Sequence, residues 1–356
     1  MIGALAHAPD PRVASREAFA DGLSRFDRAK PICVLGHFDA DGLSAVAILV
    51  RALRQAGWRA EPVTTAKGET PWDESVAAKL AEIGPGGLIL TDLGTRAQPV
   101  LPGCATIVID HHLPTGEPEG AVTISGNGLS PEPTSALLAW WACEALGAND
   151  DLLWLAALGL IGDMADGAGF PELERAQQRW GKTALKDATS LVNAPRRTAA
   201  ADPGPALRLL LEGDGPKVIT KSDSDDARAL VAAKAEVREA VEAARRVPPR
   251  VVGDVALIRF HAAQQIHPLI AQQWRGRLAD KIVLAANTGY RPGWVHFAAR
   301  SATGRNLVDF LAEHRPSGAD GRYGNGHAQA TGGALRIPDW NSFVADLGFP
   351  DQQVPA

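Results

Sequence analysis

The chain has 356 residues, 46% of them hydrophobic and 22% charged, with a formal net charge of -5. This length is enough for two domains with separate cores, and the composition is that of a soluble globular protein. The excess of negative charge excludes a global basic field that would draw the protein to nucleic acid or to a membrane, so a polyanionic ligand would need local positive charge or bound metal.

The three cysteines, Cys33, Cys104 and Cys143, form no CxxC pair, which argues against a disulfide framework or a zinc ribbon. The first ten residues lack the basic start and apolar core of a signal peptide, and no stretch of about 20 residues is apolar enough to span a bilayer. We therefore expect a cytoplasmic protein that does not insert into a membrane.

Strand and helix patterns alternate in the first part of the chain. Helices are predicted over 12–30, 43–55 and 72–83, and strands over 31–36, 60–64, 87–91 and 105–109. Short, continuously apolar strands between helices predict an α/β fold with a parallel, doubly wound sheet. After a Gly- and Pro-rich loop over 113–133, helices are predicted from 134 or 135 to about 146 and over 150–161, with Trp140, Trp141 and Trp154 in the core.

The second part of the chain predicts a smaller α/β domain behind a bridging helix. Residues 194–222 are rich in Pro, Gly, Ala and Asp and predict an irregular connection. A helix that opens with residues 222–225 and runs to about 247 follows. Strands are then predicted over 254–260, 281–287 and 294–300, helices over 268–278, 306–314 and 339–347, and a Gly-rich loop over 321–333. The predicted division is a domain over 1–215, a linker helix over 216–249 and a C-terminal domain over 250–356.

Polar clusters stand at the ends of the apolar segments of the first domain. These are His37, Asp39 and Asp41, then Asp92, then Asp110, His111 and His112, and finally Asp163 after the apolar helix. Carboxyl ends of parallel strands lie side by side, and ligands bind there in open α/β sheets. Clustered carboxylates repel unless a cation holds them, so the pattern predicts divalent metal. Asp166 is as compatible with a turn or a cap as with a ligand.

A mixed set of carboxylates and imidazoles suits two first-row divalent ions, with manganese favoured over calcium. Such a pair needs a bridging carboxylate and can activate water for in-line attack at phosphorus. The predicted cofactors are therefore two Mn²⁺ ions, with Mg²⁺ as a substitute.

The order of these motifs resembles the DHH phosphoesterase superfamily. The HxDxDG motif at His37, the TDLG turn at Asp92, the Asp110-His111-His112 triplet and the GDMAD segment at Asp163 look like its four motifs. Residues 325–333 resemble the GGHxxAxGG signature of the associated C-terminal domain, with Asn325 in place of a glycine and Thr331 in place of an alanine. Ala299-Arg300-Ser301 resembles the Arg-Ser pair that precedes this signature.

The resemblance implies a two-manganese hydrolase that clamps its substrate in a cleft between domains. It assigns His37, Asp39 and Asp92 to one ion, and Asp41, Asp92, His111 and Asp163 to the other. Asp110 would orient the imidazoles or reach metal through water, and His112 would face the scissile phosphate. Substrate phosphate would be held by Arg300, Asn325, Gly326, His327 and Gly332, with Arg305 and Arg322 as weaker candidates.

The form of the motifs is closer to RecJ-like exonucleases than to the branch that hydrolyses very short RNA and pAp. We therefore expect a RecJ-like enzyme that removes nucleotides from the 5′ end of single strands or short oligonucleotides. The alternative is a small-nucleotide hydrolase, acting on pAp, on very short RNA or on cyclic dinucleotides. A hypothesis of another class is a non-catalytic nucleotide sensor, which metal-dependent turnover would exclude. The expected partner is single-stranded nucleic acid or a nucleotide, and the sequence indicates no protein partner.

Overall fold

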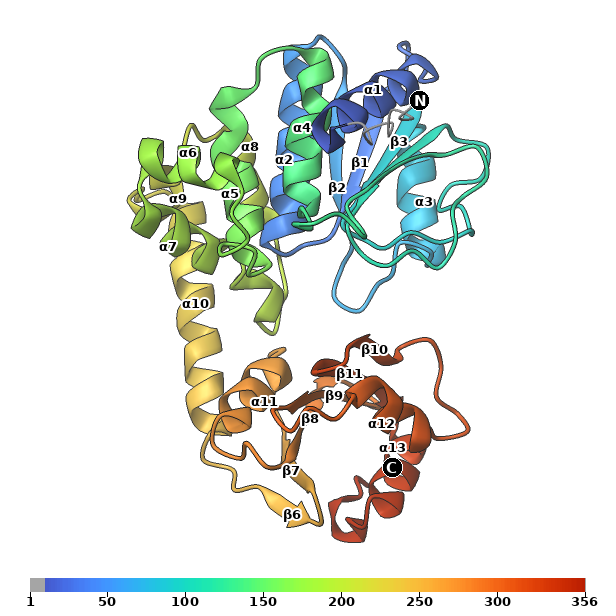
Figure 1. Cartoon of the computed structure of the whole chain (residues 1–356), viewed down its shortest axis with the longest axis vertical. Helices are drawn as coiled ribbons and strands as arrows, with labels where there is room; N and C mark the ends of the chain where they lie inside the picture. Colours follow the sequence, from blue (N-terminus) through green and yellow to red (C-terminus); the bar gives the residue numbers. More distant parts are fainter. Residues whose placement is uncertain (1–9, 356) are drawn as a thin grey trace, which may run out of the picture. The chain divides into compact units, whose positions relative to one another are not determined.

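The computed structural model describes residues 10–355, apart from the side chain of Asn325. The chain divides into two compact units (Figure 1). The first comprises the described residues up to Arg196 together with Ala201–Ala232, and the second comprises Arg197–Ala200 with the residues from Ala233 onward. The predicted bridging helix exists as α10 (Asp225–Ala244), and the division between the units falls within it.

The first unit is built on a five-stranded parallel sheet. Its strands are β1 (Ile32–Gly36), β2 (Ala60–Thr64), β3 (Gly87–Thr91), β4 (Thr106–Asp110) and β5 (Val122–Ser125). They lie in the order β2-β1-β3-β4-β5, and each neighbouring pair is parallel. The strand order reverses direction between β1 and β3, and such a switch point opens a crevice at the carboxyl ends of the strands.

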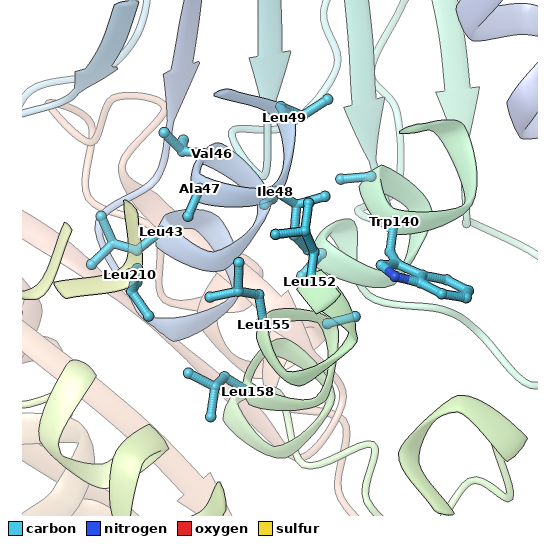
Figure 2. Packing of buried hydrophobic residues seen from close by; sticks show 14 of the residues in the cluster. Leu43, Val46, Ala47, Ile48, Leu49, Trp140, Leu152, Leu155, Leu158 and Leu210 are labelled. Carbon is cyan, nitrogen blue, oxygen red and sulfur yellow. The ribbon is translucent and has the colours of Figure 1, made fainter. Parts of the chain in front are cut away.

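Helices cover both faces of this sheet, which confirms the doubly wound prediction. On one face α1 (Pro11–Ser24), α2 (Ala40–Gln55), α4 (Ser135–Cys143) and α5 (Leu153–Gly162) enclose the main core. Figure 2 shows Ile48 of α2, Trp140 of α4 and Leu155 of α5 within this packing. On the other face α3 (Glu74–Ile83) packs Val76 and Leu80 on the strands. Trp140, Trp141 and Trp154 are buried, as predicted.

Two predictions for this unit were wrong. Strand β5 lies inside the segment expected to be a loop, because its four residues are too few to show a clear alternation. The stretch 194–222, expected to be irregular, contains α8 (Gly204–Glu212) and α9 (Lys217–Thr220), whose Leu210 and Ile219 are buried in the main core. Two further helices complete the unit, α6 (Pro171–Trp180) and α7 (Lys182–Val192).

The second unit is a six-stranded mixed sheet with helices. The strands are β6 (Arg250–Val252), β7 (Val255–Phe260), β8 (Ile282–Arg291), β9 (Trp294–Ser301), β10 (Tyr323–His327) and β11 (Ala330–Arg336). Their order is β10-β11-β9-β8-β7-β6, and only β7 and β8 form a parallel pair. The helices are α11 (His267–Arg275), α12 (Leu307–Glu313) and α13 (Ile337–Asp346).

The glycine-rich stretch over 321–333 is a hairpin of β10 and β11, and the loop prediction was wrong there. Gly324 and Gly326 have φ of 79° and 139°, values that glycine adopts without strain, and the register shifts between Tyr323 and Asn325. A Cβ on Gly332 would lie 2.4 Å from the Phe297 carbonyl oxygen of β9, so here the glycine allows a close approach of strands. Among the described residues, no helix is long and apolar enough to cross a membrane.

Candidate metal centre

The first polar cluster lies where β1 ends and α2 begins. Asp39 is the N-cap of α2, and its Oδ1 accepts a hydrogen bond from the Gly42 backbone N–H at 3.1 Å. A Cβ at position 42 would lie 2.4 Å from the His37 carbonyl oxygen, so the turn requires glycine. Asp41 falls in the first helical turn and is fully buried. The cap therefore directs His37 and two carboxylates to the carboxyl edge of the sheet.

Asp92 follows β3 directly and is 4% exposed. Its φ is 61°, a left-handed conformation that is uncommon for residues other than glycine and is often found at functional sites. Oδ2 of Asp92 lies 3.6 Å from Nδ1 of His37, and Oδ1 lies 3.6 Å from Nε2 of His111. Asp92 thus stands between the cluster after β1 and the cluster after β4, at the switch point of the sheet.

Asp110 is the last residue of β4 and is 1% exposed. Its Oδ2 accepts hydrogen bonds from the backbone N–H groups of Leu93 and Gly94 at 2.8 and 2.7 Å. Its Oδ1 accepts one from the backbone N–H of His112 at 2.7 Å and lies 2.9 Å from Nδ1 of that ring. Both oxygens are engaged by protein groups, and Asp110 belongs to none of the donor groups described below, which together favour its orienting role over contact with metal. The opposite ring edge of His112 is available to solvent, because the side chain is 53% exposed.

Asp41 is held by the N-terminus of α4. Its two carboxylate oxygens accept hydrogen bonds from the backbone N–H groups of Ser135 and Ala136 at 2.8 and 3.0 Å. The Ser135 hydroxyl also donates to Oδ1 of Asp92 at 3.1 Å. On the other side Gly159 of α5 lies so close that a Cβ there would come within 2.2 Å of Oδ1 of Asp41. Two helices distant in sequence thus fix this carboxylate.

The described residues contain three overlapping groups whose donor atoms lie within 4.8 Å of one another. These groups are His37 with Asp39 and Asp92; Asp41 with Asp92, His111 and Asp163; and Asp92 with His111 and His112. Asp92 is common to all three. The first two groups coincide with the two ligand sets that the resemblance implies, although which ion each residue would hold stays a prediction. Asp166 belongs to none of the groups and forms an ion pair with Lys186 at 2.9 Å.

The electrostatics of the site show a concentration of negative charge. Burial, followed by repulsion from Asp92 and Asp163, raises the pKa of Asp41 well above its usual value. Burial by itself would lower the pKa of His111, but the carboxylates of Asp163 and Asp92 raise it to about 11. A divalent cation would stabilise this crowded set of carboxylates.

The atoms themselves also fit a metal ion. Nε2 of His111 is buried, makes no hydrogen bond of normal geometry, and lies 3.2 Å from Oδ2 of Asp163. A buried nitrogen that faces carboxylate oxygens without a hydrogen bond is suited to a cation. We therefore conclude that the residues present fit divalent metal.

Two residues beside the centre were not identified from the sequence. Nη1 of Arg196 forms an ion pair with Oδ2 of Asp39 at 2.5 Å. Burial raises the pKa of Asp39, but attraction to His37 and Arg196 outweighs it and lowers the pKa well below its usual value. Oδ1 of Asn193 accepts a hydrogen bond from the Ala40 backbone N–H at 2.9 Å. No local pattern marks these two residues, because they reach the site from a segment more than 150 positions away.

The predicted substrate-binding residues lie in the second unit, on β9 and the β10–β11 hairpin. Arg300 of β9 pairs with Ala330 in register, and its Nη1 donates to the carbonyl oxygens of Ala299 and Thr331 at 2.8 and 3.2 Å. Gly326 and His327 are exposed at the end of β10. The other members are Asn325, also on β10, and Gly332, which lies opposite Ala298. The structure thus brings these five residues onto neighbouring strands, and their substrate-binding role stays a prediction.

Comparisons with known proteins find similarity over part of the chain. Residues 31–159 match the N-terminal domain of the DHH family. Over 166 residues the chain is 33% identical to the single-stranded-DNA-specific exonuclease RecJ of Thermus thermophilus, a match that covers 42% of this chain and 25% of that protein. The matched segment thus spans a quarter of this relative's length.

Solved structures extend the likeness of fold to nearly the whole chain. A structure of exonuclease RecJ bound to manganese superposes with a TM-score of 0.65 at 22% identity, covering 96% of this chain and 95% of the other. RecJ of Thermus thermophilus in complex with Mn²⁺ gives a TM-score of 0.69 at 22% identity, covering 99% of this chain and 56% of the other. These findings confirm the predicted resemblance: residues 31–159 match the N-terminal domain of the DHH family, and the chain has a RecJ-like fold.

Proposed function

We propose that this protein is a metal-dependent phosphodiesterase that hydrolyses nucleic-acid phosphodiester bonds, removing nucleotides from the 5′ end of single-stranded DNA or short oligonucleotides. The observation that carries the proposal is the pair of donor sets that share the buried Asp92 at the switch point of a parallel sheet. The similarity of this chain to a single-stranded-DNA-specific exonuclease supports single-stranded nucleic acid as the substrate class.

In this proposal the two donor sets would hold two Mn²⁺ ions. His37 and Asp39 belong to one set, Asp41, His111 and Asp163 belong to the other, and Asp92 belongs to both. Manganese is favoured over calcium because the sets combine imidazole nitrogens with carboxylate oxygens. When bound, such a pair would supply Lewis-acid polarisation of a phosphoryl oxygen and a lower pKa for a water nucleophile.

His112 is the proposed proton donor to the phosphate. The hydrogen bond to Asp110, reinforced by the charge of that carboxylate, raises the pKa of His112 and so favours the protonated ring. Because Nδ1 faces Asp110, the other ring nitrogen is directed to the half-exposed side, where a substrate oxygen can accept its proton. Asp110 acts as a positioning residue that fixes the ring and the turn after β3.

We assign recognition of substrate phosphate to the second unit. Arg300 supplies a guanidinium whose Nη1 is fixed by two backbone carbonyl groups, and His327 stands exposed among glycines whose backbone N–H groups can meet an anion. The first unit would then perform the chemistry and the second would bind the substrate.

The test is hydrolysis by the purified protein with Mn²⁺, compared with Asp92→Ala. The substrates are long single-stranded DNA labelled at its 5′ end, an RNA of two to five nucleotides, pAp and a cyclic dinucleotide. We expect stepwise release from the 5′ end of the long strand, lost in the variant and in EDTA. Activity confined to short or cyclic substrates would assign the protein to small-nucleotide hydrolysis instead. Mn²⁺ binding without turnover of any substrate would refute the enzymatic proposal.

A further inference from the structure

Two large apolar side chains are exposed directly beside the candidate metal centre. The exposed large hydrophobic residues of the described chain are Leu113 (76%), Met164 (87%), Val231 (57%), Val251 (50%) and Val252 (43%). The two most exposed, Leu113 and Met164, each follow a site residue: Leu113 comes after His112, and Met164 after Asp163. Scattered exposed hydrophobic residues need no explanation, but the concentration of the two most exposed ones at one site indicates a ligand.

The two segments that carry these side chains are held to each other at the centre. Nε2 of His111 lies 3.2 Å from Oδ2 of Asp163. His111 is two positions before Leu113, and Asp163 is one position before Met164. The segments that contain Leu113 and Met164 therefore each begin at a member of the same donor group, His111 in one and Asp163 in the other. Neither Leu113 nor Met164 lies in a helix or a strand. The backbone positions are set by the site, whereas their side chains extend into solvent.

Met164 also adopts a backbone conformation that favours another residue. It lies just beyond α5, after the C-cap Asp163, and has φ of 60°. The following Ala165 N–H donates to the Leu160 carbonyl at 2.8 Å, the pattern of a helix end that usually has glycine at the left-handed position. A simple helix end would gain from glycine or asparagine, which carry less strain there. Methionine therefore adds strain and exposed apolar area without a gain in packing, which a contact with a ligand would explain.

We propose that Leu113 and Met164 bind the nucleobase of the 5′-terminal nucleotide, whose phosphodiester bond to the second nucleotide is hydrolysed at the metal centre. This inference rests on the proposed function and specifies its substrate contact. A base joined to a phosphate at the centre has a flat apolar face, and a flexible thioether makes favourable contacts with aromatic rings. Neither side chain offers a strong hydrogen-bonding group, so the contact accepts all four bases.

The test is a double-mutant cycle between the protein and the substrate. The protein pair is the natural chain and Met164→Gly, which removes the side chain and relaxes the left-handed backbone. The substrate pair is a single-stranded oligonucleotide with and without its 5′-terminal base. We expect either change alone to raise KM about three- to tenfold with kcat little changed, because the contact is made equally before and during the reaction. When the variant is assayed with the oligonucleotide that lacks the base, we expect KM to rise no more than it does for either change alone.

Two further variants make the cycle specific. Leu113→Ala is expected to follow Met164→Gly, whereas Val231→Ala, an exposed apolar residue of α10, is expected to leave KM unchanged for both oligonucleotides. Calorimetric titration with Mn²⁺ checks that each variant keeps its metal affinity. The proposal would be overturned if the increases in KM from Met164→Gly and from removal of the base multiplied, or if Val231→Ala raised KM as much as Met164→Gly does.

The cycle also separates this proposal from the proposed function. If the natural chain binds Mn²⁺ but cleaves nothing, the function fails, and the same cycle is measured on dissociation constants by fluorescence anisotropy. Coupled losses of affinity then support the base contact in a non-catalytic protein. Binding that does not depend on the terminal base overturns it.

Discussion

Gly159→Ala tests whether the shape of the first unit holds Asp41 in place. Gly159 is buried in α5, and an added Cβ would lie 2.2 Å from Oδ1 of Asp41, 2.6 Å from Cβ of Ala136 and 3.2 Å from Oγ1 of Thr134. Cβ atoms essentially never approach other heavy atoms closer than 3.0 Å. Either the carboxylate or helix α4 must therefore move, and the two hydrogen bonds from the α4 N-terminus to Asp41 must distort.

The expected effects on stability and on metal binding differ in size. Alanine improves the intrinsic helix propensity by about 1 kcal/mol, whereas overpacking a dense core costs about 1–3 kcal/mol. The free energy of unfolding should consequently fall by only about 0–2 kcal/mol. Loss of the hydrogen bonds that orient a metal-binding side chain typically lowers metal affinity about 10–100-fold. We expect a loss of this size in the affinity of Gly159→Ala for Mn²⁺.

Calorimetric Mn²⁺ titration and urea unfolding measure the two quantities on the same preparation. Gly167→Ala is the matched control, because the same added methyl group meets no heavy atom within 4 Å there. The control should bind Mn²⁺ as the natural chain does. Unchanged Mn²⁺ affinity in Gly159→Ala would refute the conclusion that Asp41 belongs to the metal centre and is fixed by α5.

Three further predictions concern the same centre. Arg196→Ala removes the cation paired with Asp39, and since about 1 kcal/mol of Coulomb energy is released for metal, calorimetry should show roughly fivefold tighter Mn²⁺ binding; weaker binding would contradict this. Ser135→Ala deletes the hydrogen bond to Asp92 and should weaken Mn²⁺ binding about tenfold, whereas an unchanged dissociation constant would count against it. In EDTA, burial by itself would lower the pKa of His37, but the carboxylates of Asp39 and Asp92 raise it to about 10 in the folded protein. The folded protein therefore keeps a proton that the unfolded chain loses above about pH 6.5. The stability that this proton contributes is lost as pH rises towards 10. Urea midpoints should accordingly fall between about pH 6.5 and 9.5, less steeply in His37→Gln; equal slopes would exclude His37 as the source.

The parts of the fold that the sequence predicted are those encoded by local pattern. Buried parallel strands are apolar along their whole length, so the runs at β1, β3 and β4 were identified almost to the residue. The predictions failed where local pattern is weak or misleading. A four-residue strand at β5 shows little periodicity, and the glycines of the β10–β11 hairpin suggested a loop although they serve close strand contacts.

The candidate site shows the same division. The sequence by itself determined which ligand types are present and that they follow strand ends, because a carboxylate after an apolar run has few structural uses. Only the tertiary structure decided that Asp92 is shared by two donor sets and that both oxygens of Asp110 are occupied. It alone brought Arg196 to Asp39 and pressed Gly159 against Asp41, since such contacts depend on the packing of distant helices, which no local spacing records.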